Sequence, residues 1–83
     1  MTEGILFADL DFHGNTYRVY VNGTAELIET RHTVPVPDGH LERLGHGPFW
    51  QRPNGYAFAS DLTQKLNIIV AELEMRAREA VGS

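Results

Sequence analysis

Residues 6–12 place an apolar side chain at every second position, and this alternation constrains the fold more than any other feature of the chain. The apolar members are Leu6, Ala8, Leu10 and Phe12. A period of two is typical of a β-strand that buries one face and exposes the other to water. The chain must therefore supply a paired strand and a layer that covers the apolar face.

A two-residue turn signal, Gly14-Asn15, follows this strand and predicts a β-hairpin. With this turn every apolar position meets another apolar position: Phe12 lies opposite Tyr17, Leu10 opposite Val19, and Ala8 opposite Val21. On the other face Asp11 lies opposite Arg18, a favourable cross-strand pair of charges. Both faces therefore support the same register.

A second turn signal, Asn22-Gly23, predicts a third antiparallel strand. A plain two-residue turn would place Glu26 on the core face, opposite Val19. An unpaired carboxylate is costly to bury, so we expect one bulged residue near the turn, with Leu27 opposite Val19 instead. The glycine can adopt the left-handed conformation that such a bulge requires.

The middle of the chain is rich in Pro and Gly. Residues 33–48 hold three of each and show no sustained hydrophobic period, which predicts a long irregular connection. Residues 49–52 and 56–59 carry aromatic side chains on either side of the turn signal at 53–55. This pattern predicts a short aromatic hairpin.

A helix is predicted from about Asp61 to Val81. Ser60 suits the N-cap, Thr63 leaves the capping box incomplete, and Gly82 ends the helix. The apolar side chains recur at helical spacing and form one stripe: Leu62, Leu66, Ile69, Val70, Leu73, Ala77 and Ala80. On the solvated side two pairs of opposite charge are four residues apart: Glu72 with Arg76, and Glu74 with Arg78.

These elements predict one α+β domain over residues 1–83. It comprises a three-strand antiparallel β-meander at 1–32, a long Pro/Gly-rich connection with the short aromatic hairpin at 33–59, and one C-terminal helix at 60–82 packed on the sheet. A chain of 9.3 kDa has too few apolar residues to form two separate cores.

Composition excludes or disfavours several classes of function. The chain has no Cys, which excludes disulfides, thiolate zinc sites and cysteine nucleophiles. It has no phosphate loop, dinucleotide motif or nucleophile elbow, so we expect no catalysis and no cofactor. The formal net charge is -4, with six scattered Arg and one Lys, which disfavours a nucleic-acid surface. Because signal-peptide and membrane-span patterns are missing, we expect a cytoplasmic protein that does not bind membranes.

The strongest candidate site is the aromatic hairpin. Five of its residues form the candidate partner-binding surface: Phe49, Trp50, Gln51, Arg52 and Tyr56. Trp and Tyr are enriched at the energetic centres of protein interfaces, so Trp50 is the expected anchor within a docking segment at 34–58. The alternative is that Trp50 and Phe58 complete the core beneath the connection.

A second candidate surface lies on the helix. Ile68, Ala71 and Met75 form a weaker apolar stripe opposite the main one, which suits a homodimer contact. The alternative is that they are scattered surface residues, which are common on folded domains.

Metal ligation is the third candidate. Asp9, Asp11 and His13 alternate onto one strand face, but same-face neighbours on a strand are about 6.7 Å apart and converge poorly on one ion. His40 and His46 lie in the irregular connection without a compact ligand motif. The sequence therefore predicts no metal site, with these five residues as the candidates if one exists.

The function predicted from the sequence is a small non-enzymatic protein-binding module, an accessory or inhibitor subunit that docks through its aromatic loop. A compact acidic domain without catalytic motifs is also typical in composition of small phage or mobile-element inhibitors. One alternative is a small His/Asp-based metal-dependent enzyme or binder assembled across a homodimer. A second alternative is a sheet-type nucleic-acid-binding protein, whose affinity would fall steeply with salt.

Overall fold

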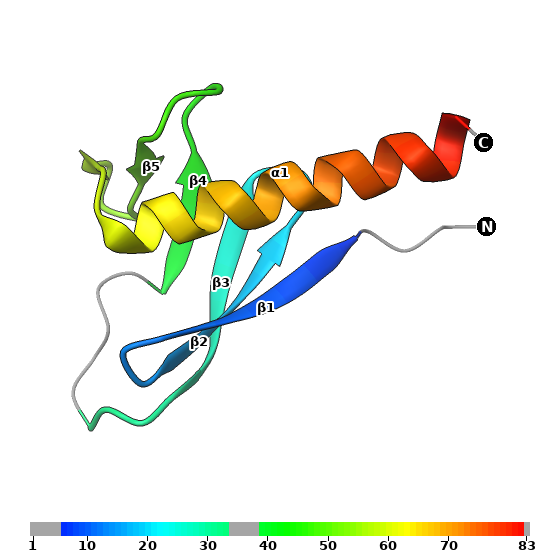
Figure 1. Ribbon diagram of the computed structural model, residues 1–83. Helices are drawn as coiled ribbons and strands as arrows, with labels where there is room; N and C mark the ends of the chain where they lie inside the picture. The colour runs from blue at the N-terminus through cyan, green and yellow to red at the C-terminus, as the bar shows by residue number, and fades with distance from the viewer. Residues whose placement is uncertain (1–5, 34–38, 83) are drawn as a thin grey trace.

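The computed structural model describes residues 6–33 and 39–82, and it shows an antiparallel sheet with one long helix across a single face (Figure 1). The sheet has six strands in chain order: β1 (Phe7–Phe12), β2 (Asn15–Tyr20), β3 (Thr24–Thr30), β4 (His40–Arg43), β5 (Trp50–Gln51) and β6 (Ala57–Phe58). The helix is α1 (Asp61–Gly82). The α+β class is confirmed, but the sheet is larger than the three strands and short hairpin that the sequence predicts.

The turn between β1 and β2 lies one residue earlier than expected. His13 and Gly14 both have positive φ, 50° and 85°, so they are the two central residues and Asn15 belongs to β2. The pairs shift accordingly: Leu10 lies opposite Tyr17, Ala8 opposite Val19, and Asp9 opposite Arg18. The predicted register is therefore wrong by two positions. An even shift leaves every side chain on its predicted face.

The turn between β2 and β3 uses the left-handed glycine that the sequence predicts, Gly23, at φ 90°. Glu26 is exposed, as expected, and Ala25 rather than Leu27 lies opposite Val19. The β-bulge lies further along the ladder than predicted. The small Ala25 side chain is fully buried at this position.

Strand β4 lies within the segment that the sequence predicts to be irregular. It pairs with β3 and places Leu41 in the core with no exposed surface. Only one of its four residues is a buried hydrophobe, so no alternation of useful length marks it in the sequence. Part of the predicted connection, residues 34–38, lies outside the described residues.

One hydrophobic core joins the sheet to α1. Its buried members come from both layers: Tyr17, Val19, Ala25, Leu41, Trp50, Leu62, Leu66 and Val70. On β1 the even-numbered positions are half-buried and the odd-numbered ones exposed, so the strand faces the helix with one side only. None of the described residues forms a layer over the opposite face of the sheet (Figure 1).

The start of α1 is held by a buried hydroxyl. The Thr63 Oγ1 accepts a hydrogen bond from the Ser60 backbone N–H at 2.6 Å and donates one to the Ser60 carbonyl at 2.8 Å. Thr63 therefore satisfies the backbone group that Glu or Gln satisfies in a complete capping box. Unlike those side chains it is short enough to be fully buried.

An ion pair joins β4 to α1. Arg43 Nη2 donates to Glu74 Oε2 at 3.2 Å, and the two side chains are 13% and 40% exposed. The sequence predicts that Glu74 pairs with Arg78 along the helix, but the structure pairs it with the strand instead. The guanidinium is the more deeply buried partner, so it depends more on the pair than the carboxylate does.

We expect Glu74→Gln to lower the free energy of unfolding by about 1 kcal/mol, because it leaves the largely buried Arg43 without a counter-charge. The matched variant Glu72→Gln removes the same charge from the exposed side of α1 and should change stability by less than about 0.5 kcal/mol. Urea denaturation of both variants measures the difference. Equal losses would show that the Arg43 pair contributes nothing specific.

Candidate functional site

Trp50, the expected anchor of the aromatic hairpin, belongs to the core. Its side chain has 0% exposure, and its indole Nε1 donates a hydrogen bond to Asn67 Oδ1 at 2.8 Å. Residue 50 lies opposite Arg43 on β4, so β5 turns the indole toward the helix side of the sheet. The interpretation of Trp50 as a partner-binding anchor is therefore wrong, and the alternative, that it completes the core, is the correct one.

Trp50 fixes the last two strands to the helix. A buried indole N–H needs an acceptor, and Asn67 supplies it from α1. The neighbouring position on β4, Arg43, makes the ion pair with Glu74, which lies about two helical turns beyond Asn67 on α1. Two adjacent positions of the sheet are thus attached to one helix. The hairpins that flank β5 are held by the same two contacts.

Two aromatic residues close to the Trp50–Asn67 and Arg43–Glu74 contacts are exposed. Phe49, which directly precedes Trp50, is 50% exposed, and Tyr56 in the turn between β5 and β6 is 71% exposed. Leu44, in the turn between β4 and β5, is also exposed, and its N–H donates to the Phe49 carbonyl at 3.0 Å. We refer to Leu44, Phe49 and Tyr56 as the exposed hairpin residues.

Backbone hydrogen bonds fix the turn that carries Tyr56. Gly55, at φ 93°, donates its N–H to the Arg52 carbonyl at 2.9 Å, and Arg52 donates its N–H to the Tyr56 carbonyl at 2.8 Å. Asn54 Oδ1 accepts from the Tyr56 N–H at 3.0 Å. A φ near 90° favours glycine, so Gly55 determines the form of this turn.

The two polar members of the predicted surface serve the hairpin itself. The Arg52 guanidinium lies 3.9 Å from the centre of the Phe58 ring, and Gln51 Nε2 donates to the Gly55 carbonyl at 3.3 Å. Both side chains are half-buried. They therefore rigidify the hairpin in addition to any contact they make with a partner.

The candidate dimer residues on α1 are exposed. Ile68, Ala71 and Met75 lie on the solvent side of the helix, away from the buried stripe. Their accessibility is compatible with a contact between copies of this chain. The homodimer itself stays a prediction.

The three acidic and imidazole groups on β1 and its turn have separate roles. Asp9 Oδ1 accepts from Arg18 Nε at 3.1 Å, and Asp11 Oδ1 accepts from the Thr16 hydroxyl at 2.7 Å. The predicted Asp11–Arg18 pair is therefore replaced by Asp9–Arg18. The hydrogen bond to Asp9 raises the pKa of Arg18. His13 occupies the turn rather than the strand face.

The other candidate ligands are also not assembled into a metal centre. His40 Nε2 lies 3.3 Å from Glu42 Oε2, and His40 Nδ1 lies 3.7 Å from Glu26 Oε2, in a row across β3 and β4. His46 is exposed in the turn between β4 and β5. Among residues 6–33 and 39–82, no group of three or more His, Asp or Glu side chains has the arrangement that a metal ion requires.

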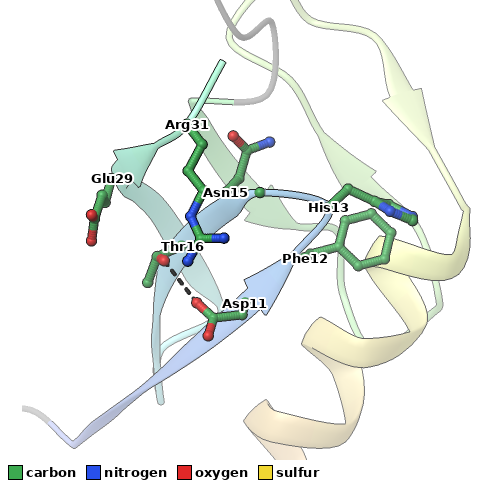
Figure 2. A pocket seen from close by; sticks show the side chains of 8 residues that line it. Asp11, Phe12, His13, Asn15, Thr16, Glu29 and Arg31 are labelled. Atoms are coloured by element: carbon green, nitrogen blue, oxygen red, sulfur yellow. Dashed lines mark hydrogen bonds between the residues drawn. The ribbon is translucent and has the colours of Figure 1, made fainter.

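A polar hollow of about 190 Å³ lies beside the turn between β1 and β2, and residues of this turn line it (Figure 2). Asp11, Glu29 and Arg31 border it, and the Arg31 side chain extends toward Thr16 and Asp11 in Figure 2. Sequence reasoning assigns no role to Arg31, because it follows the predicted third strand without a motif around it. The three charged side chains are exposed, so ionic contacts to a small ligand here would be weakened by water.

Comparison with models of known protein families, with curated protein sequences and with solved structures finds no match to this chain. In the part of the chain that the structure describes, no helix is long and apolar enough to cross a membrane. The function must therefore be argued from the chain's own residues.

The Trp50–Asn67 hydrogen bond can be tested with a double-mutant cycle. Asn67→Ala should lower the free energy of unfolding by about 1–3 kcal/mol, because it leaves a buried indole N–H without an acceptor. In a Trp50→Phe background, which lacks that N–H, the same change should cost clearly less. Urea denaturation of the four proteins gives the coupling energy. Additive losses would contradict the role assigned to Asn67.

Proposed function

We propose that this chain is a non-enzymatic protein-binding module, an accessory or inhibitor subunit, which docks through its exposed hairpin residues. The observation that carries the proposal is the exposure of Phe49 and Tyr56 on hairpins that the core holds in place. In this proposal the contact residues are the neighbours of Trp50, and Trp50 itself determines their position.

Exposed aromatic side chains favour protein binding for an energetic reason. Aromatic residues supply large contact areas with few rotatable bonds, and they are enriched among residues that dominate interface affinity. Phe49 and Tyr56 leave 50% and 71% of their surface in water, which a partner would cover. The gain from that burial is the driving force that the proposal requires.

Pre-organisation adds to this driving force. A loop that becomes ordered only on binding loses conformational entropy at that step, which weakens affinity. The Tyr56 turn is already closed by the Gly55–Arg52 and Arg52–Tyr56 backbone hydrogen bonds. The Phe49 backbone is likewise restricted, because its carbonyl accepts a hydrogen bond from the Leu44 N–H and the next residue, Trp50, is buried.

Charge favours a protein partner over a nucleic acid. The formal net charge is -4, and two of the six arginines, Arg18 and Arg43, are paired with carboxylates on the protein itself. A nucleic-acid surface needs basic groups that are free to neutralise phosphates.

The proposal predicts the outcome of affinity capture from a nuclease-treated lysate of the source organism. The double variant Phe49→Ala/Tyr56→Ala should lose a protein that the wild type retains, with affinity lower by about 10- to 100-fold. The matched control Ile68→Ala/Met75→Ala removes exposed apolar side chains from α1 and should retain the partner. Circular dichroism checks that both variants are folded.

Three results would contradict the proposal. Equal retention by Phe49→Ala/Tyr56→Ala and the wild type would exclude the hairpins as the docking site. Loss of binding in the α1 control alone would move the site to the helix. A partner captured only when nuclease is omitted would indicate the nucleic-acid alternative instead.

A further inference from the structure

Strand β1 is an edge strand with a free set of backbone hydrogen-bonding groups. Among residues 6–33 and 39–82 it is the first strand in the sheet order and pairs on one side only, with β2. The Val21 N–H donates to the Leu6 carbonyl at 3.0 Å, which fixes the phase of the ladder. Because hydrogen-bonded pairs alternate in an antiparallel ladder, the N–H and C=O groups of Phe7, Asp9 and Asp11 point outward.

The two sides of this edge differ in chemistry. On the open face of the sheet the edge carries the carboxylates of Asp9 and Asp11, both exposed. On the helix side a groove of about 520 Å³ lies between the end of β1 and the first half of α1. Phe12 and Ile68 contribute apolar surface to it, and Asp61 and Lys65 contribute one charge of each sign. A strand added here would therefore meet acidic groups with one set of side chains and a partly apolar groove with the other.

We propose that β1 binds an extended basic segment of another protein as an additional strand of the sheet. Lysine or arginine side chains at alternate positions of the segment face Asp9 and Asp11, and apolar side chains at the intervening positions face the groove beside Ile68. Backbone hydrogen bonds to Phe7, Asp9 and Asp11 supply affinity, and the alternating pattern supplies specificity.

Asp11 contributes more to charge recognition than Asp9. The Asp9 carboxylate is already neutralised by Arg18 at 3.1 Å. Asp11 accepts a hydrogen bond from a neutral hydroxyl, that of Thr16, and the Arg31 side chain extends toward both residues (Figure 2). No ion pair to Asp11 is formed within the described residues. A basic side chain on an added strand can approach it from the free edge.

The same charges disfavour a second copy of this chain as the occupant. Residues that face each other across a symmetric antiparallel pair lie on the same face of the sheet. The two self-pairing registers that use most of β1 place Asp9 opposite Asp9 of the second copy, or Asp9 opposite its Asp11. Like charges directly opposite destabilise a pair of strands, whereas a basic strand brings a counter-charge to Asp11, the aspartate that forms no ion pair within the described residues.

The test uses a blocked hexapeptide of alternating Lys and Val as the probe, followed by NMR of the ¹⁵N-labelled protein. Binding should shift the amide signals of Phe7, Asp9 and Asp11 and slow their hydrogen exchange. The amides of the intervening residues already bond to β2 and should change less. Two control peptides, one alternating Glu and Val and one with all Lys before all Val, should bind at least about tenfold more weakly.

Two pairs of variants measure separately how much the Asp11 charge and the backbone hydrogen bonds contribute to peptide binding. Asp11→Asn should weaken binding of the Lys/Val peptide by about threefold in low salt, while Glu79→Gln, which removes the same charge from α1, should not. Phe7→Pro removes one outward N–H at the start of the strand, where proline is tolerated. It should bind more weakly than Phe7→Ala, which lacks the same aromatic ring but keeps the N–H.

Three results would overturn the proposal. The first is the absence of protection at the three outward amides when the Lys/Val peptide is present. The second is equal binding by Asp11→Asn and the wild type. The third is protection of the same amides in concentrated protein without peptide, which would make a second copy the occupant. This edge lies across the sheet from the hairpins at β5 and β6, so failure here leaves the proposed docking of the hairpins untouched.

Discussion

The burial of Trp50 beneath α1 is the constraint on which the rest of the structure depends. The indole is the largest fully buried side chain among the described residues, and its N–H donates a hydrogen bond to Asn67. Strands β5 and β6 have two residues each, too few to be held by their own ladder hydrogen bonds. They are attached to the domain by this side chain, by the packing of Phe58 against the core, and by the Arg43–Glu74 pair one strand away. The exposed positions of Phe49 and Tyr56 follow from that attachment.

The architecture leaves the two edges of the sheet with different surfaces. One edge ends in tight hairpins that present aromatic side chains, and the other is the six-residue strand β1, whose outward groups are acidic on one side and lie beside a groove on the other. Among the described residues, neither edge gathers three or more His, Asp or Glu side chains that could hold a metal ion. We propose that both surfaces bind other chains, one through aromatic contacts and the other through strand addition.

The elements whose apolar residues recur at a regular spacing could be predicted from the sequence. The apolar stripe of α1 and the alternation of β1 gave the correct helix, the correct strand faces and the α+β class. The hairpin register could not be derived, because His13 adopts a left-handed conformation that the Gly14-Asn15 signal does not indicate. Strand β4 was missed because it buries one hydrophobe. The sequence does not determine which face of the sheet Trp50 lies on, because two residues are too few to show an alternation. The role of Asn67 cannot be predicted from its neighbours in the sequence, because its hydrogen-bond partner lies 17 residues away.

The central claim is that Trp50 lies in the core and attaches β5 to α1, and that it is not exposed as an anchor for a partner. This claim can be tested directly because the chain contains one Trp. The measurement is the fluorescence of the native protein, with its emission maximum and its quenching by iodide compared with those of the urea-unfolded chain. A buried indole predicts emission at clearly shorter wavelength than in the unfolded state and little quenching by iodide. Emission at the unfolded wavelength with full quenching would place Trp50 in water and contradict both its role in the core and the positioning of the hairpins.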